Sequence, residues 1–248
     1  MSHLSLPAIL ISIVALLFSL SVHEASHAAA AYLLGDRTAA ERGRMTLNPI
    51  PHIDLVGTII FPLLGLLFGG FFIGWAKPVP FEPARLTRRM RMKYSSALVW
   101  AAGPVSNLFL SLVFMCVVAA TARSLDPNGW GRVELFRAAF EGPDALARLG
   151  VEALPALVLG LGGTLIGLNV LLAAFNLIPL GALDGAGIFR VLVPDRYVHR
   201  YDAFRYHPYA WIALVLLGLT GVLSLFLAPI QMGAYRLLLH PARLILGV

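Results

Sequence analysis

Long apolar runs separated by short polar connections dominate this 248-residue chain. A helix needs about 20 residues to cross the hydrocarbon core of a bilayer, and four runs reach that length: about Pro7 to Leu34, Ser95 to Ala122, Leu154 to Leu177 and Pro208 to Leu227. A fifth run, Leu55 to Trp75, contains Pro62 and five glycines, which favour a broken or re-entrant element. The pattern predicts an all-α multi-pass membrane protein with about four transmembrane helices and an irregular membrane-embedded segment near 55–75.

The remaining segments add no soluble domain. The closing stretch, Ile230 to Val248, mixes leucines with three basic residues, and we expect its helix to break at Pro241 and to lie along the membrane interface. No internal repeat is present, and the longest polar connection runs only from Arg123 to Glu152. We therefore expect a single membrane domain over 1–248, with a core at about 5–190 and further helices at about 191–248.

Composition excludes a water-soluble protein. Hydrophobic residues make up 58% of the chain and charged residues 13%, whereas soluble domains are about a quarter charged. The net charge of +6 arises from basic residues in short connections, which is typical of cytoplasmic loops rather than of a nucleic-acid surface. The single cysteine, Cys116, excludes an intramolecular disulfide and is expected to be a packing residue.

Three ionisable groups interrupt the first apolar run, in the sequence His23-Glu24-Ala25-Ser26-His27. On a helix, residues four apart lie about 40° apart around the axis and about 6 Å along it, so both imidazoles can reach one metal ion. Glu24 lies beside them, where a carboxylate can deprotonate a metal-bound water. Burying each charged group costs about 2 to 3 kcal/mol without a partner. A signal peptide would contain no such groups, so the motif indicates a metal site.

Two histidines do not complete a catalytic zinc site, which usually has three protein ligands. The extended motif H-E-x-x-H-x-x-G-x-x-H would need glycine and histidine where this chain has Ala30 and Leu33. Either the third ligand is remote in sequence or the site does not bind zinc. Asp184 is a candidate, because Pro179 and the nearby glycines can break the helix and turn its carboxylate inward. Taken alone, this stretch fits a simple helix end equally well.

The two motifs together resemble the site-2 protease family of intramembrane zinc metalloproteases, in its branch without PDZ domains. HEASH stands in the first apolar helix and NLIPLGALDG begins at Asn176. Similar pieces occur at Asn48–Asp54, Gly57–Thr58, Gly74–Pro80 and Ala102–Asn107. One departure is Leu180–Ala182, where relatives commonly have a proline-richer stretch.

This resemblance implies a complete site. Zn²⁺ would be bound by His23, His27 and Asp184, with Glu24 as the catalytic base and Asn176 near the substrate backbone. The enzyme would hydrolyse peptide bonds within or near transmembrane segments of membrane-bound proteins, using zinc-activated water. Its partners would be a transmembrane protein substrate and the lipid bilayer, with no nucleic acid, and the sequence contains no signal for the oligomeric state.

Two alternatives keep the same residues but change the function. In a transporter or channel, the His, Glu and Asp side chains would bind a carried ion or relay protons. A catalytically inactive scaffold would not need both motifs intact. Ion flux across sealed vesicles without peptide cleavage would distinguish the transporter.

Charge distribution predicts the orientation. Basic residues gather in 77–93 and again after Asp184, so the positive-inside rule places both connections in the cytoplasm, while the sign-balanced connection 123–152 lies outside. The metal motifs then lie towards the cytoplasmic side of the cell membrane. Both ends of 55–75 fall on that side as well, so we expect this segment to dip into the membrane and return.

Other polar residues have structural explanations. We expect His52 and Asp54 to organise a loop rather than to orient a ligand. Gly103 and Asn107 are expected to provide close helix contact and an interhelical hydrogen bond.

Overall fold

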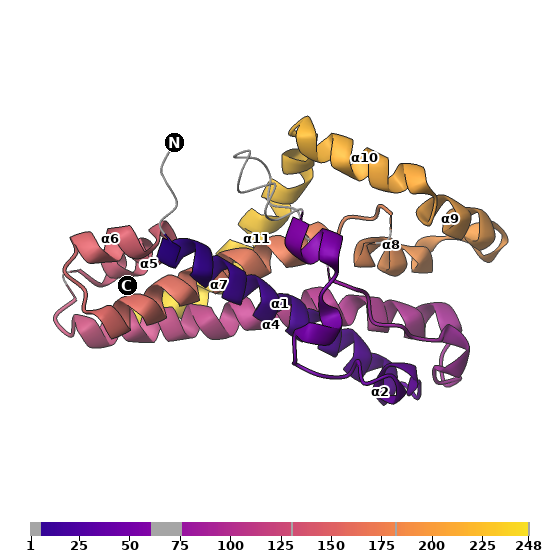
Figure 1. Ribbon diagram of the computed structural model, residues 1–248, viewed down its shortest axis with the longest axis horizontal. Coiled ribbons are helices and arrows are strands. Elements are labelled where there is room, and N and C mark those ends of the chain that lie inside the picture. Colours follow the sequence, from indigo (N-terminus) through magenta and orange to yellow (C-terminus); the bar gives the residue numbers. More distant parts are fainter. Residues whose placement is uncertain (1–5, 61–75, 130, 182, 248) are drawn as a thin grey trace. The chain divides into compact units, whose positions relative to one another are not determined.

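The computed structural model describes residues 6–60, 76–129, 131–181 and 183–247 as a helical protein without strands in those ranges (Figure 1). The longer helices are α1 (Leu6–Leu33), α4 (Met92–Leu125), α5 (Arg132–Glu141), α7 (Ala153–Asn176), α10 (Pro208–Leu219) and α11 (Val222–Leu246). Shorter ones are α2 (Thr38–Glu41), α6 (Pro143–Arg148), α8 (Asp184–Phe189) and α9 (Val198–Arg205). The predicted all-α class is confirmed.

Within the described ranges, four helices are long and apolar enough to cross a membrane. They are Ile9–Leu33 within α1, α4, α7 and α11, with 25, 34, 24 and 25 residues. At about 1.5 Å per residue, even the shortest exceeds the roughly 30 Å hydrocarbon core. The prediction of about four spans is confirmed.

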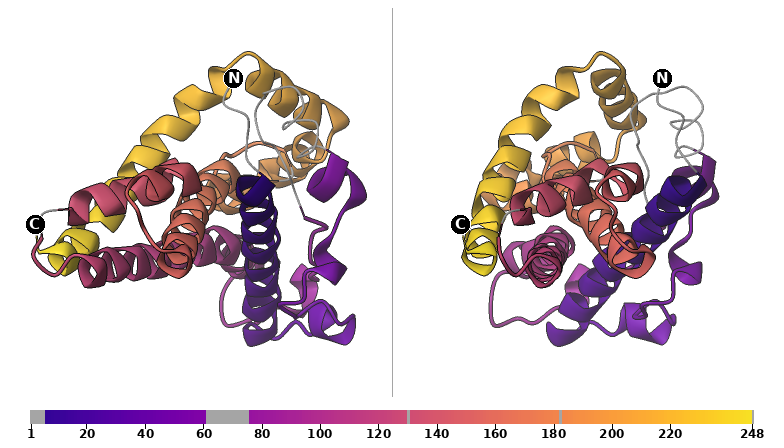
Figure 2. Two further views of the ribbon diagram at one scale, coloured as in Figure 1. Left: turned by 60° about the vertical axis from the view of Figure 1, so that its left-hand side comes forward. Right: turned by 90° about the vertical axis from the view of Figure 1, so that its left-hand side faces the viewer.

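The fourth span lies further along the chain than the apolar run at 208–227 predicts. Helix α10 ends at Leu219, and Gly221 adopts a positive φ of 74°, a conformation that glycine accepts without strain. The chain bends there, as Figure 2 shows, and α11 begins at Val222. The 12 residues of α10 extend only about 18 Å, too short to cross.

The expected break at Pro241 is wrong, because α11 continues through Pro241 to Leu246. The end of the helix is stabilised by two arginines that donate to its last carbonyl groups. Arg123 donates to Ile245 O at 2.6 Å and Arg132 donates to Leu246 O at 2.9 Å. An interfacial position for the end of this helix stays a prediction.

The segment near 55–75 is described only at its start. Leu55–Ile60 forms a π-helix rather than an α-helix, with the Asp54 carboxylate accepting hydrogen bonds from the N–H groups of Val56 and Gly57. The predicted re-entrant course of residues 61–75 lies outside the described residues.

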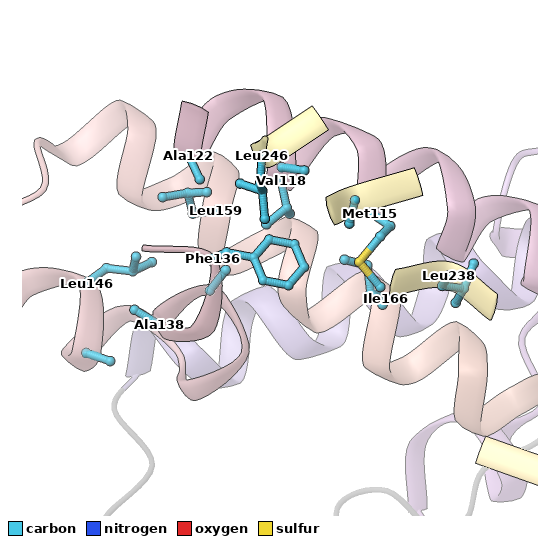
Figure 3. Packing of buried hydrophobic residues seen from close by; sticks show 14 of the residues in the cluster. Met115, Val118, Ala122, Phe136, Ala138, Leu146, Leu159, Ile166, Leu238 and Leu246 are labelled. Atoms are coloured by element: carbon cyan, nitrogen blue, oxygen red, sulfur yellow. The ribbon is translucent and has the colours of Figure 1, made fainter. Parts of the chain in front are cut away.

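The chain divides into two compact units, each with its own core. Unit 1 contains residues up to Ser19, Asn107–Leu171 and Gln231 onward. Its apolar core includes Met115, Ile166 and Leu238, with the Phe136 ring of α5 beside them (Figure 3). A Cβ on Gly163 would collide with the Ala139 carbonyl group, so glycine allows α5 to lie directly against α7.

Unit 1 also contains a buried amide network. The Asn107 side chain donates to Asn169 Oδ1 at 2.7 Å, and Asn169 donates to Ser19 Oγ at 2.8 Å. All three side chains are fully buried. This network joins α1, α4 and α7, which confirms the interhelical hydrogen bond predicted for Asn107. Unit 2, Leu20–Ser106 and Leu172–Ile230, contains the candidate site.

Candidate metal centre

The second half of α1 positions the two histidines. His23 and His27 lie one turn apart on one face of the helix and are both buried. Their Nε2 atoms are 3.1 Å apart, with the rings nearly perpendicular. The i, i+4 spacing therefore brings two imidazole nitrogens to one point.

Asp184 reaches the same point from α8, of which it is the first residue. Its Oδ2 atom lies 3.1 Å from His23 Nε2 and 3.3 Å from His27 Nε2, and the side chain is buried. Helix α7 ends at Asn176, and the turn that follows uses Gly181 at a φ of 62°. A Cβ on Gly185 would collide with Leu177 O, so glycine lets α8 pack onto this turn. The structure thus brings the three residues of the two motifs together.

The three atoms fit a metal ion. Asp184 Oδ2 is buried and accepts no well-directed hydrogen bond within the described residues. Two imidazole nitrogens and one carboxylate oxygen are a usual zinc ligand set, with bond lengths of about 2.0 to 2.2 Å. Ligands around a tetrahedral ion at that distance lie about 3.3 to 3.6 Å apart, close to the observed separations of 3.1, 3.1 and 3.3 Å. An ion would satisfy all three atoms at once.

Helix α4 orients the His27 ring. His27 Nδ1 lies 2.7 Å from the carbonyl oxygen of Val99, so Nδ1 carries the proton and donates to it. The lone pair of Nε2 is then free for a metal, the usual arrangement for a histidine ligand. A Cβ on Gly103 would lie 2.5 Å from Cε1 and 2.6 Å from Nε2 of His23. Glycine is therefore required for α4 to contact both imidazoles, which confirms the predicted close helix contact.

Glu24 is buried beside the histidines and is held by the backbone of another segment. Its Oε2 atom accepts a hydrogen bond of 2.8 Å from the N–H of Val79. Val79 stands between Pro78 and Pro80 in a stretch without regular structure. That stretch is fixed on either side, because the N–H of Lys77 donates to His52 O at 2.8 Å and the N–H of Glu82 donates to Asp36 Oδ2 at 2.6 Å.

Asp36 is a structural anchor that was not predicted from the sequence. It is fully buried just after α1 and accepts hydrogen bonds from the N–H and hydroxyl of Thr38 as well as from Glu82. Burial acts to raise the pKa of this carboxyl, but the Thr38 hydroxyl and the two backbone N–H groups outweigh it, so the pKa lies below its ordinary value. The sequence signal was the Gly35-Asp36-Arg37-Thr38 pattern, typical of a helix end followed by a side-chain-capped turn.

Two predicted polar positions have local partners. Asn176 lies in the last turn of α7, and its Nδ2 donates to Leu172 O at 3.0 Å. Its role towards a substrate stays a prediction. His52 is buried, with Nε2 2.9 Å from Thr46 O; together with the Asp54 hydrogen bonds, this supports the expected loop-forming role.

Arg205 and Tyr201 of α9 also contact the Asp184 turn, a role that was not predicted from the sequence. Arg205 is only 3% exposed and donates from Nε to Gly181 O at 3.1 Å and from Nη2 to Leu183 O at 3.4 Å. The Tyr201 hydroxyl donates to Ala186 O at 2.7 Å. In the sequence, Arg205 was one of several basic residues that mark a cytoplasmic connection, and no pattern singled it out.

Comparison with known proteins gives an independent result. The model of peptidase family M50 matches residues 11–219. Over 218 residues, the chain is 35% identical to "Putative zinc metalloprotease YwhC" of Bacillus subtilis, covering 88% of this chain and 84% of the relative. The chain is also similar to two proteins described as "Putative zinc metalloprotease Rip2". It is 28% identical to the one from Mycolicibacterium smegmatis, covering 69% of this chain and 52% of the relative. It is 30% identical to the one from Mycobacterium tuberculosis, covering 86% of this chain and 65% of the relative. No solved structure matches the chain.

Proposed function

Since this chain belongs to peptidase family M50, we propose that it hydrolyses peptide bonds within or near transmembrane segments of other membrane-bound proteins. It is a zinc metalloprotease, and the part of the chain that the structure describes contains four helices able to span a membrane. The observation that carries the proposal is the buried meeting of His23, His27 and Asp184, because two of these residues belong to a span-capable helix.

The roles of the residues follow from their chemistry. His23, His27 and Asp184 would hold the zinc ion, which when bound polarises the scissile carbonyl and lowers the pKa of water. Glu24 takes a proton from the attacking water and delivers it to the leaving amine nitrogen. Its Oε2 is engaged by the N–H of Val79, so we assign the proton transfer to Oε1.

The substrate is a transmembrane segment that unwinds locally so that its backbone reaches the site. An extended backbone within the membrane needs hydrogen-bond partners. We assign one of them to Asn176, which ends α7 a few residues before Asp184 and whose side-chain oxygen is a potential acceptor. Residues 1–248 would act as a single protease domain embedded in the lipid bilayer.

The orientation proposal rests on charge. Six basic residues and one acidic residue stand in 77–93, and further arginines follow Asp184. The positive-inside rule places these connections in the cytoplasm, with the active site towards that face. This orientation is tested with Arg88→Cys in a Cys116→Ser background, by labelling the introduced thiol from either side of sealed vesicles.

The function is tested by comparing the purified native protein with Glu24→Gln in detergent. Zinc content and cleavage of a transmembrane peptide substrate are measured for both. We expect both to contain zinc and only the native protein to cleave, because Gln cannot accept the proton. Cleavage by Glu24→Gln at the native rate would contradict the assignment. Ion flux through sealed vesicles with no cleavage by the native protein would favour a transporter instead.

A further inference from the structure

Helix α9 lies beside α8 (Figure 1). Two of its side chains reach the turn that presents Asp184. Tyr201 and Arg205 are four residues apart and so share one face of α9. Between them they bind three backbone carbonyl groups, those of Gly181, Leu183 and Ala186. These carbonyls lie on both sides of Asp184 in the sequence.

The environment of Arg205 is unusual for a charged residue. A buried guanidinium is costly unless its N–H groups are satisfied and its charge is compensated. Within the described ranges, Arg205 forms no ion pair with a carboxylate; its charge is met by the two carbonyl oxygens and by the faces of Trp100 and Tyr206, at 4.5 and 5.0 Å from the ring centroids. The side chain is therefore directed at backbone dipoles rather than at a surface acid.

Trp100 connects this cation to the rest of the site. A Cβ on Gly187 would collide with the indole ring, so α8 packs directly on Trp100. The same ring lies in edge contact with the imidazole of His27, at 6.2 Å between centroids. Arg205 and α8 thus both lie against an aromatic ring that also touches the metal-binding face of α1.

We propose that Arg205 and Tyr201 are positioning residues for Asp184, which fix the turn 181–186 so that Oδ2 meets the Nε2 atoms of His23 and His27. This inference rests on the proposed zinc-dependent function. It predicts that α9 sets the affinity for zinc without touching the ion or the substrate.

Zinc affinity, measured by competition with a chromophoric chelator, tests the inference on the full-length protein in detergent. We expect Arg205→Met to weaken zinc binding about 10- to 100-fold, the usual effect of losing a group that orients a ligand. Tyr201→Phe removes one hydrogen bond and should weaken it about fivefold. Arg205→Lys keeps the charge but not the forked contact and should fall between Arg205→Met and the native protein. The exposed Arg200 on the same helix gives the matched control, because Arg200→Met should leave affinity unchanged.

Three readouts separate positioning from general damage. Saturating zinc should restore most of the kcat of Arg205→Met, which a misfolded protein would not show. Cobalt-substituted Arg205→Met should have a changed visible absorption spectrum, because the carboxylate ligand is displaced. In an Asp184→Ala background, Arg205→Met should weaken zinc binding no further, because the carboxylate that Arg205 positions is absent.

Zinc affinity within twofold of native for Arg205→Met and Tyr201→Phe would overturn the inference, as would an undiminished effect in the Asp184→Ala background. If Arg205→Met does not fold, Arg205→Lys and Tyr201→Phe decide by the same criteria. Failure of the proposed function is distinguishable, because the native protein itself would then bind no zinc or cleave no substrate.

Discussion

Two clusters of three buried polar side chains in this chain differ in their chemistry. In the cluster Ser19, Asn107 and Asn169, amide hydrogens meet oxygen acceptors at 2.7 and 2.8 Å. In the cluster His23, His27 and Asp184, two ring nitrogens and a carboxylate oxygen face one another at 3.1 to 3.3 Å. A cluster of paired donors and acceptors is complete by itself, whereas two imidazole nitrogens and a carboxylate oxygen form a ligand set that suits a zinc ion.

Ser19, His23 and His27 recur every four residues along α1, so one stripe of a single helix supplies both clusters. The difference therefore arises from what other segments bring to the stripe. Asn169 brings a hydrogen-bond donor and an acceptor, and Asp184 brings only acceptor oxygens. Substitutions that affect one cluster and not the other test this distinction.

The largest expected effect is that of Asp184→Ala. Removing the carboxylate leaves two imidazoles, which hold zinc only weakly, so the ion should be lost during purification and cleavage should be undetectable. Metal analysis and the peptide assay check this. A zinc-replete, active Asp184→Ala protein would show that the third ligand is another residue.

Gly103→Ala should have the next largest effect, because its Cβ would lie within 2.6 Å of the His23 ring. We expect zinc affinity to fall at least about tenfold, as for other changes that displace a ligand. The control is Gly233→Ala in α11, where a Cβ meets nothing within 4 Å; it should leave zinc binding intact. Equal zinc affinity for the two variants would contradict the close packing of α4 on the imidazoles.

Asn169→Leu should disrupt the cluster of Ser19, Asn107 and Asn169 and leave the cluster of His23, His27 and Asp184 intact. It removes the two hydrogen bonds that Asn169 makes with Asn107 and Ser19, which should lower the free energy of unfolding by about 1 to 3 kcal/mol. Zinc content should remain native. Thermal unfolding in detergent gives the first quantity and metal analysis the second. Loss of zinc from folded Asn169→Leu protein would mean that the amide cluster also maintains the site.

Asp36→Asn should have the smallest effect and a defined pH dependence. Because the folded-state pKa of Asp36 lies below its ordinary value of about 3.9, its carboxylate stabilises the fold above that value, and the contribution is lost as pH falls through the folded-state pKa. The variant should be less stable than the native protein by about 1 kcal/mol at pH 7, with the difference shrinking below pH 4. Unfolding measured from pH 3 to 7 tests this; a constant difference would exclude the carboxylate as its source.

The sequence predicted the parts of the fold and site that depend on spacing. Apolar runs located three of the four span-capable helices, and the i, i+4 interval placed both histidines on one helix face. The bend at Gly221 was missed, because an apolar run is continuous whether or not one glycine adopts a positive φ. The convergence of Asp184 with the histidines could be anticipated only through resemblance, since no local rule relates residues so far apart.

Contacts to the backbone were the least predictable. Arg205 acts through carbonyl oxygens of a distant turn, and Val79 acts through its own N–H, so neither interaction depends on a side-chain pattern that can be read along the chain. Asp36 lies between these cases, since its turn pattern was visible but its bond to Glu82 was not.

The proline on either side of Val79 has a consequence for whatever approaches Glu24. Proline has no N–H, and the one amide hydrogen in Pro78-Val79-Pro80 is already donated to Glu24. These three residues can therefore offer an incoming polypeptide nothing but acceptors. Any main-chain hydrogen bond to this stretch has to use an N–H group of the incoming polypeptide.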